Sequence, residues 1–204
     1  MDSPAPISLY LASQSPRRRE LLTQIGVAHQ VVRVDVVEQP QVQESPSNYV
    51  QRLALEKASA GWAQVNQSGL AVGPVLGADT IVVINEQILE KPRDAEHATA
   101  MLRLLAGATH QVMTAVAMVN AEQQLVKLSV TDVVFRSLDE AEINAYWHTG
   151  EPQDKAGGYA IQGLGAVFVE QIRGSYSGVV GLPIEQTVAL LQEFNVPWWQ
   201  SYKS

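Results

Sequence analysis

The chain has 204 residues, of which 46% are hydrophobic, and its formal net charge at pH 7 is −7. The length and the hydrophobic fraction are enough for a buried core in one domain or in two closely packed lobes. The negative charge disfavours general binding of DNA or RNA, whose phosphates it would repel. No apolar run approaches the roughly 18 residues of a membrane span, and residues 1–6 do not have the pattern of a secretory signal. Cysteine is absent, which excludes disulfides and thiol chemistry and is typical of a cytoplasmic protein.

Strands and helices are predicted to alternate along the chain. In chain order, we expect a strand over 7–12, a helix over 16–25, strands over 30–36 and 75–84 separated by a helix over 46–65, a turn into 88–89, a helix over 94–105, strands over 112–119 and 125–135, a helix over 139–148, a strand over 166–172 and a helix over 183–194. Ser45 and Pro46 are typical of a helix start. This interleaving predicts an α/β fold with a mixed, twisted sheet and flanking helices.

Three arginines, Arg17, Arg18 and Arg19, fall in the first turn of the helix that follows the first strand, with Ser15 as the predicted N-cap. Cations are unfavourable there, because the free amides and the macrodipole favour negative charge. They become favourable if an anion is bound by the amides and guanidinium groups together. A solvated basic helix start is the alternative. On the anion-binding interpretation, removing Arg17 or Arg18 weakens binding without lowering thermal stability.

Lys57 lies on the apolar face of the helix predicted over 46–65. Its neighbours on that face, at steps of three and four residues, are Val50, Leu53, Ala54, Ala58 and Gly61. A lysine in this position either snorkels, with a buried stem and an ammonium group in water, or meets a charged group inside the protein. Taken alone, the pattern favours snorkelling.

The strand predicted over 75–84 is strongly apolar and is interrupted by one acid, Asp79, and its neighbour Thr80. An ionised carboxylate in such a strand is unfavourable unless it is paired or bound to a metal ion. Asp79 is therefore the best candidate for a catalytic or metal-binding group. A structural hydrogen bond to a loop, or a cap at the strand end, is the alternative.

Two further segments suit a phosphate ligand less specifically. Lys91 and Arg93 flank Pro92 just before a predicted helix start, an arrangement that is also common in surface loops. Residues 150–163 lead two acids and Lys155 into a glycine-rich stretch, where the backbone can approach a ligand closely. A flexible loop is the alternative for this stretch.

Several common chemistries are excluded. The chain has no G-x-x-x-x-G-K-[ST] phosphate loop, no H-E-x-x-H zinc motif and no G-x-S-x-G nucleophile elbow, and its four histidines have no ligand spacing. The candidates left are a basic cluster, a semi-buried acid and a few further carboxylates. These are the groups needed for metal-assisted phosphate chemistry.

Taken in order, five motifs resemble those of the Maf-type nucleotide pyrophosphatases, over about residues 9–194. They are Ser13-x-Ser15-Pro16-Arg17-Arg18, Gly77-Ala78-Asp79-Thr80, Lys91-Pro92, Asp154-Lys155-Ala156-Gly157 and Val179-Val180-Gly181-Leu182-Pro183. The chain looks closest to the YhdE-type branch, which hydrolyses dTTP and UTP. The sister branch that acts on 7-methyl-GTP typically has tryptophan in place of Thr80. Two departures are visible: Gly158 and Ala160 exchange the usual small residues, and Gly178 stands where many members carry asparagine.

This resemblance implies a single Maf-like domain over 1–204, with its core over about 9–194 and a tail over 195–204. The fold would have two lobes around a nucleotide cleft, similar to the inosine-triphosphate pyrophosphatases. It also implies a cytoplasmic enzyme, often homodimeric, with a nucleoside triphosphate substrate and Mg²⁺ or Mn²⁺ as cofactor. Nucleic acid and membranes are not expected partners.

The resemblance also implies roles for individual residues. Asp79 would accept a proton from the attacking water and bind the metal ion together with Glu38, which lies in a variable stretch. Catalytic support is implied for Lys57 and Lys91. Substrate contacts are implied for Ser13, Arg17, Arg18, Thr80 and Gln162, of which Arg17, Thr80 and Gln162 would set base selectivity.

Two other functions remain open from the sequence. A non-catalytic regulator of septum formation could keep the nucleotide site and use it for sensing. A hydrolase of damaged purine nucleotides is supported by analogy of fold alone. Pyrophosphate release from a panel of nucleotides separates these functions from a dTTP/UTP pyrophosphatase.

Overall fold

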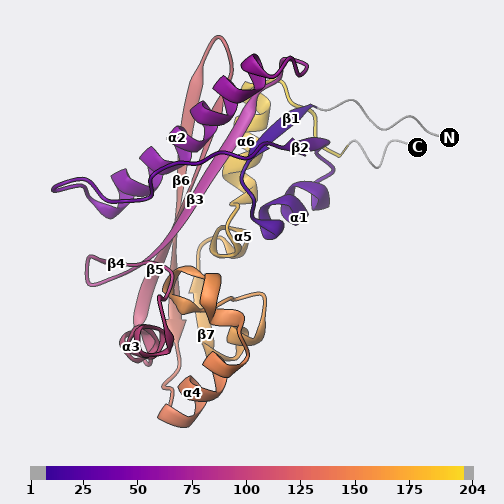
Figure 1. Ribbon diagram of the computed structural model, residues 1–204. Coiled ribbons are helices and arrows are strands. Elements are labelled where there is room, and N and C mark those ends of the chain that lie inside the picture. Colours follow the sequence, from indigo (N-terminus) through magenta and orange to yellow (C-terminus); the bar gives the residue numbers. More distant parts are fainter. Residues whose placement is uncertain (1–7, 200–204) are drawn as a thin grey trace. The chain divides into compact units, whose positions relative to one another are not determined.

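The computed structural model describes residues 8–199 (Figure 1). Residues 1–6, where no secretory signal is expected, and residues 200–204 of the predicted tail lie outside the described residues. Among the helices between residues 8 and 199, none is long and apolar enough to cross a membrane.

Within the described residues, seven strands form one mixed sheet in the order β2-β1-β3-β5-β6-β7, with β4 paired to β3. The strands are β1 (Leu9–Ala12), β2 (His29–Val31), β3 (Val75–Ile84), β4 (Gln87–Leu89), β5 (Thr109–Val119), β6 (Gln124–Phe135) and β7 (Val169–Arg173). β1 is parallel to β2 and β3, whereas β4 is antiparallel to β3 and β7 is antiparallel to β6. The predicted α/β fold with a mixed sheet is therefore confirmed.

The helices are interleaved with the strands, and the first two begin directly after Ser15 and Ser45, as predicted. They are α1 (Pro16–Gln24), α2 (Pro46–Gln67), α3 (Ala95–Leu105), α4 (Glu140–His148), α5 (Tyr176–Val180) and α6 (Ile184–Glu193), with 3-10 helices η1 (Glu151–Asp154), η2 (Ala156–Gly158) and η3 (Leu164–Phe168). The Ser45 hydroxyl caps α2 by accepting a hydrogen bond from the Asn48 amide. Asp94 and Asp139 cap α3 and α4 in the same way.

The chain divides into two compact units. Within the described residues, the first unit runs to Asp79 and includes Ala115–Leu128 and the residues from Gly181 onward, and the second comprises Thr80–Thr114 and Ser129–Val180. The nucleotide cleft expected between two lobes stays a prediction.

In the first unit, α2 packs closely on the sheet because two glycines leave room for it. A Cβ atom at Gly61 would lie 2.8 Å from a Val75 methyl carbon. At Gly77, on β3, a Cβ atom would lie only 2.3 Å from the Ala54 carbonyl oxygen of α2. Contacts this short do not occur between real atoms, so these positions require glycine for the helix to lie where it does.

The second unit has an aromatic core. Phe135 makes edge contacts with the rings of His110 and Tyr159, and the Tyr159 hydroxyl is hydrogen-bonded to His110 Nε2 at 2.8 Å. Gly157, with φ of +69°, packs against the side chain of Val82. The glycine-rich stretch is therefore ordered and buried in part, and is not a flexible loop.

The strands predicted over 30–36 and from residue 166 are each wrong at one end, and one short helix was not predicted. The strand predicted over 30–36 ends at Val31, because its partner β1 ends at Ala12 and offers no further backbone groups. Residues 164–168 form a 3-10 helix, so the strand predicted from residue 166 begins at Val169. Helix α5 was not predicted, and with five residues it is too short to show a periodic pattern.

Candidate active site

Asp79 is held inside the first unit, near the middle of β3. Apart from Thr80, the other residues of the strand are apolar and buried, and Asp79 itself is 7% exposed. Burial raises its pKa above the usual value, although the nearby Lys57 and Arg18 side chains act in the opposite direction. A buried carboxylate with a raised pKa is better matched to proton transfer near neutral pH than an exposed one.

Lys57 pairs directly with Asp79, and this contradicts snorkelling. Its Nζ lies 2.7 Å from Asp79 Oδ1 and 2.5 Å from Glu38 Oε1. The Lys57 side chain is 12% exposed, so the ammonium group is held between the two carboxylates and does not extend into water. The close approach of α2 to Gly77 explains this geometry, because Lys57 and Asp79 lie next to that contact on the helix and on the strand.

The segment that carries Glu38 is fixed to α2 by Arg52. Arg52 forms a bidentate pair with Glu44 at 2.7 Å for both contacts and donates to the Gln39 carbonyl at 3.0 Å. The Arg52 hydrogen bonds lower the pKa of Glu44 to about 2, so this pair stays ionised well into the acid range. Glu38 is thus brought to Lys57 by an ordered segment, although it is 47% exposed.

Ser13 and Arg18 form a second group in the same unit. Arg18 Nη1 donates to Ser13 Oγ at 3.0 Å and to the Ala78 carbonyl at 2.8 Å, and Nε donates to the Gly181 carbonyl at 2.8 Å. Arg18 therefore ties the start of α1 to the residue before Asp79 and to the Gly181 motif. Arg17, in contrast, makes no hydrogen bond or ion pair within residues 8–199.

These contacts change the expectation for Arg18 but not for Arg17. We expect Arg17→Ala to raise the KM for dTTP and to leave the Tm unchanged, because an unpaired cation at a helix start is removed. Arg18→Ala is expected to lower the Tm by at least about 2–4 °C, since two carbonyls lose a charged donor and each loss costs about 1–3 kcal/mol. Thermal unfolding and steady-state kinetics of the two variants check both expectations.

The exposed Arg19, from the same helical turn, provides the matched control. Arg19→Ala should change neither the Tm nor the KM. An Arg18→Ala protein as stable as wild type would show that the carbonyl contacts are not important for the fold.

Thr80 belongs to the second unit and points to the opposite face of β3 from Asp79, since side chains alternate along a strand. Its Oγ1 lies 2.9 Å from Thr114 Oγ1 on β5, and Thr114 Oγ1 lies 2.8 Å from the Gly178 carbonyl. Thr114 is completely buried. Thr114 was not among the residues predicted from the sequence, because nothing marks one threonine in an apolar strand.

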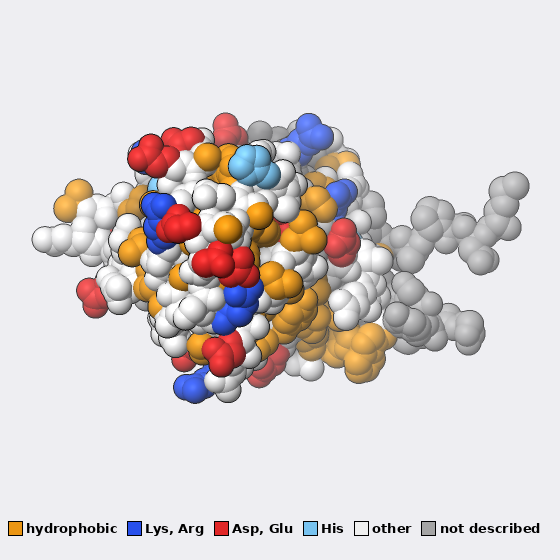
Figure 2. All heavy atoms as spheres, turned by 90° about the horizontal axis from the view of Figure 1, so that it is seen from below, with side chains coloured by type: hydrophobic (Ala, Val, Ile, Leu, Met, Phe, Trp, Pro, Cys, Tyr) orange, Lys and Arg blue, Asp and Glu red, His pale blue; other side chains and the backbone are white. Residues whose placement is uncertain are grey.

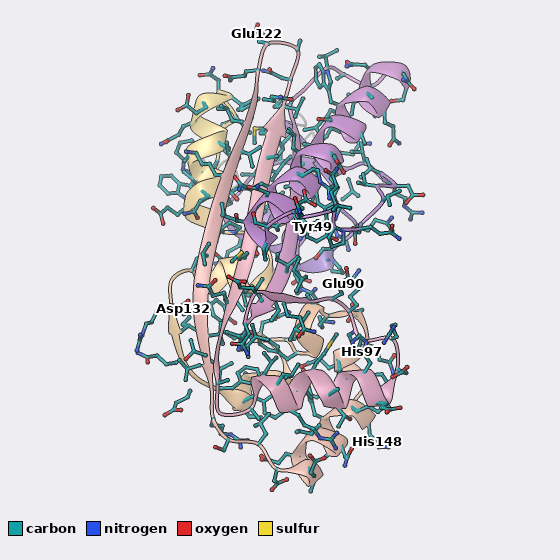
Figure 3. The ribbon with its side chains drawn as sticks, turned by 90° about the vertical axis from the view of Figure 1, so that its left-hand side faces the viewer. Tyr49, Glu90, His97, Glu122, Asp132 and His148 are labelled. Atoms are coloured by element: carbon teal, nitrogen blue, oxygen red, sulfur yellow. The ribbon has the colours of Figure 1, made fainter. Side chains whose placement is uncertain are left out.

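In the second unit, the segment that leads to Lys91 is joined to the glycine-rich stretch that precedes Gln162. Lys91 is exposed and follows Glu90, which Figure 3 labels at the end of β4. The Gly157 amide donates to the Glu90 carbonyl at 3.1 Å, so the lysine segment is joined to the glycine-rich stretch. The exposed Gln162 side chain makes no hydrogen bond to any described residue, and its carboxamide is available to a ligand.

Glu151 fixes the turn after Gln162, a role that was not predicted from the sequence. Its carboxylate accepts hydrogen bonds from the Leu164 and Gly165 amides at 2.9 Å each and from the Tyr146 hydroxyl at 2.7 Å. A Cβ atom at Gly163 would lie 2.0 Å from Glu151 Oε2, so a side chain at position 163 would have to displace the Glu151 carboxylate. In the sequence, Glu151 stands out only as one of the two acids that precede the glycine-rich stretch.

A metal site made by the protein alone is not found among residues 8–199, where no three histidine or acidic side chains gather. The histidines fit this result: His97 lies on α3 and His148 at the end of α4 (Figure 3), and His110 is buried in the aromatic core. Asp79 and Glu38 bring two carboxylates to one ammonium group, that of Lys57. Mg²⁺ is commonly held by one or two carboxylates together with substrate phosphates and water, and this pair fits that pattern.

Charged side chains of both signs are mixed on the molecular face in Figure 2, and a continuous basic patch is not visible on that face. The expectation that nucleic acid is not a partner stays a prediction.

The family model described as "Maf-like protein" matches residues 8–194. A dTTP/UTP pyrophosphatase of Saccharophagus degradans is 61% identical over 193 residues, which cover 95% of this chain and 91% of that protein. A dTTP/UTP pyrophosphatase of Shigella dysenteriae is 58% identical over 188 residues, covering 92% of this chain and 93% of that protein. Among solved structures, the Ham1 protein of Staphylococcus aureus is similar with a TM-score of 0.45 and 13% identity, over 63% of this chain and 71% of that one.

Proposed function

The chain belongs to the family of Maf-like proteins, and we propose from this premise that it hydrolyses dTTP and UTP to the nucleoside monophosphate and pyrophosphate. The observation that carries the proposal is the buried Asp79 carboxylate, paired with Lys57 at 2.7 Å in a family whose named relatives are pyrophosphatases. The reaction needs a base to take a proton from water and positive charge beside the phosphates. Asp79 can act as the base, and Lys57 supplies positive charge.

In the proposed reaction, Asp79 accepts a proton from a water molecule as the water oxygen forms a bond to the α-phosphorus. The bond from the α-phosphorus to the bridging oxygen breaks, and pyrophosphate leaves with the electron pair. Phosphoryl transfer of this kind depends mainly on positioning and on neutralisation of charge. The raised pKa of Asp79 makes it a stronger proton acceptor than an ordinary aspartate.

Cationic side chains would neutralise the phosphates. Arg17 lies at the start of α1, where free amides and the helix dipole also favour an anion. Burial raises the pKa of Asp79, and Lys57 acts against this rise by favouring the ionised carboxylate, because an adjacent ammonium group lowers the pKa of a carboxylate. Lys91 is exposed and carries its charge free of any ion pair to a described residue.

Family membership makes a divalent metal ion the expected cofactor, and we propose Mg²⁺ or Mn²⁺. Asp79 and Glu38 would hold it, because both carboxylates already share one cation, the Lys57 ammonium group. When bound, such an ion would supply further positive charge to the phosphate oxygens. Lys57, which lies between the two carboxylates, would contribute its own positive charge beside the phosphates.

Base selectivity would rest on Arg17, Thr80 and Gln162. A carboxamide has an acceptor and a donor side by side, and the edge of thymine or uracil offers the matching N3–H donor and O4 acceptor. A site built on hydrogen bonds rejects a mismatched base strongly, because its polar groups are then left unpaired. Location in the cytoplasm and assembly as a homodimer stay predictions from the sequence.

Release of pyrophosphate from a nucleotide panel, with and without Mg²⁺ or Mn²⁺, tests the proposal. We expect kcat/KM for dTTP and UTP to exceed that for CTP, ATP and GTP by at least about 100-fold, the scale of discrimination reached by polar recognition. Gln162→Ala should narrow this gap, chiefly by lowering the two pyrimidine rates.

Equal kcat/KM for dTTP and GTP in the wild-type enzyme would contradict the assignment of substrate. Binding of dTTP without release of pyrophosphate would instead support a nucleotide-sensing regulator.

A further inference from the structure

Gln162 lies in a tight turn of the second unit that is closed by a backbone hydrogen bond. The Gly163 amide donates to the Ala160 carbonyl at 3.2 Å, so Ile161 and Gln162 are the two central residues of the turn. Ile161 is 7% exposed and belongs to the hydrophobic core, whereas the Gln162 side chain is exposed. The turn therefore holds its apolar residue in the core and leaves the neighbouring carboxamide open to a ligand.

Hydrogen bonds to two side chains hold the backbone on both sides of this turn. On one side, the Ala160 amide donates to the Tyr146 hydroxyl at 3.2 Å. On the other, the Leu164 and Gly165 amides each donate to the Glu151 carboxylate at 2.9 Å. These two amides begin η3, whose N-cap residue is a glycine without a side chain. Glu151 therefore satisfies amides that a helix start leaves without a partner.

The two anchoring side chains are also bonded to each other. The Tyr146 hydroxyl donates its one proton to Glu151 Oε1 at 2.7 Å and accepts from the Ala160 amide. Burial raises the pKa of Glu151, but the hydrogen bonds from Tyr146 and from two backbone amides outweigh it and leave the pKa below the usual value. Glu151 is therefore ionised at neutral pH, where a carboxylate accepts hydrogen bonds and has no proton to donate.

The Tyr146–Glu151 pair is itself held in the core. Tyr146, on α4, is 5% exposed, and its ring makes an edge contact with Phe168 at the end of η3, with 4.8 Å between the ring centroids. Glu151 opens η1, which follows α4 in the chain. One short segment of the chain thus supplies both anchors of the Gln162 turn.

We propose that Glu151, together with Tyr146, is a positioning residue for base selectivity, because it holds the turn that presents the Gln162 carboxamide to the base. This inference rests on the proposed function, in which Gln162 recognises thymine or uracil. A carboxamide pairs with that edge of the base only when its acceptor and its donor both lie within hydrogen-bond distance. Since the Gln162 side chain makes no hydrogen bond to a described residue, its position depends on the backbone that carries it.

Glu151→Gln tests this role with little change of shape. A carboxamide has one oxygen, so in either orientation its NH₂ group faces the Leu164 or the Gly165 amide, and that amide loses its acceptor. UTP and CTP are the probes, because they differ only at the edge of the base that a carboxamide would read. We expect the UTP-to-CTP ratio of kcat/KM to fall by about 10- to 100-fold, since a misplacement of about 1 Å can cost about 100-fold in rate. The fall should come from the UTP rate, with the CTP rate nearly unchanged.

A double-mutant cycle separates positioning from a general loss of structure. If Glu151 acts through Gln162, Glu151→Gln should lower the ratio in the wild-type enzyme but not in the Gln162→Ala enzyme, which has no carboxamide to position. Two independent effects would instead multiply.

Two further variants complete the experiment. Tyr146→Phe keeps the ring and removes the hydroxyl that joins the Ala160 amide to Glu151. It should lower the ratio in the same way, and it replaces Glu151→Gln if that variant does not fold. Glu140→Gln removes a carboxylate of α4 that pairs with Arg103 at 2.7 Å in both contacts, and it should leave the ratio unchanged.

A folded Glu151→Gln enzyme with the wild-type ratio would overturn the inference, and so would an equal fall of the ratio in the Gln162→Ala background. The ratios of the wild type and of Gln162→Ala are measured first. If the wild type does not prefer UTP to CTP, or if Gln162→Ala keeps the full preference, the proposed function fails in its account of base selectivity. A preference that Gln162→Ala reduces and Glu151→Gln does not alter refutes this inference alone.

Discussion

Asp79→Asn is expected to lower kcat/KM for dTTP by at least about 100-fold, the usual effect of losing a general base. Asparagine has nearly the shape of aspartate, so the packing of β3 around it is kept. Its amide cannot take a proton from water, and it is a much weaker metal ligand. Asp35→Asn, at an exposed position in the same unit, serves as the control and should retain the wild-type rate. A folded Asp79→Asn protein with near wild-type turnover would remove Asp79 from the mechanism.

The pH dependence gives the same prediction a second readout. Because burial raises the pKa of Asp79, the acid limb of the wild-type pH profile should lie above about 3.9, the value of an ordinary aspartate. A folded-state pKa above the unfolded one means that the folded protein binds this proton more tightly. Its contribution to stability is then present at low pH and is lost as the pH rises through the folded-state pKa. Asp79→Asn resembles the protonated form and should therefore have an unchanged or higher Tm at pH 8.

Lys57→Met is expected to reduce turnover by about 100-fold or more and to lower stability as well. Loss of one positioned charge at a reacting group typically costs this much in rate. Removing one partner of a buried ion pair also costs about 3–5 kcal/mol, because the remaining carboxylate stays buried without its cation. Methionine keeps most of the apolar stem, so the loss reflects the ammonium group.

The stability loss should depend on pH in a defined direction. Without Lys57 the pKa of Asp79 rises further, so the destabilisation is present where Asp79 is ionised and is relieved where it is protonated. The Tm difference between wild type and Lys57→Met should therefore be smaller at pH 5 than at pH 8. Lys127→Met, which removes a lysine with no ion pair to a described residue, is the control. Snorkelling of Lys57 would instead predict near wild-type activity and a Tm difference that does not change with pH.

The family and most of the fold could be predicted from the sequence, because their signals are local. The prediction of a Maf-type protein is confirmed by the family model over residues 8–194. The strand over 75–84 was predicted with the bounds that β3 has, since its apolar run ends at a clear turn. The strand predicted over 30–36 was too long because its length is set by β1, a partner that lies elsewhere in the sequence.

The site was also predictable only in part, because spacing along the chain gives local information and does not identify partners elsewhere in the sequence. Helical spacing correctly placed Lys57 on the inward face of α2, but it could not identify Asp79 and Glu38 as the groups that it meets. The contacts of Arg18 with Ala78 and Gly181 join residues far apart in the sequence, and no spacing rule describes them. The roles of Asp79, Lys91 and Gln162 in catalysis and binding stay predictions, as does that of Ser13.

The close contact at Gly77 has a consequence for how the chain responds to random mutation. Any side chain at this position would push α2 away from β3 and separate the ammonium group of Lys57 from Asp79. A selection for active variants would therefore reject substitutions at position 77 as strictly as those at position 79. Intolerance to mutation alone would mark both positions as active-site residues, although Gly77 has no side chain that could take part in the reaction. Separating the two kinds of position requires a measurement of folding stability beside the measurement of activity.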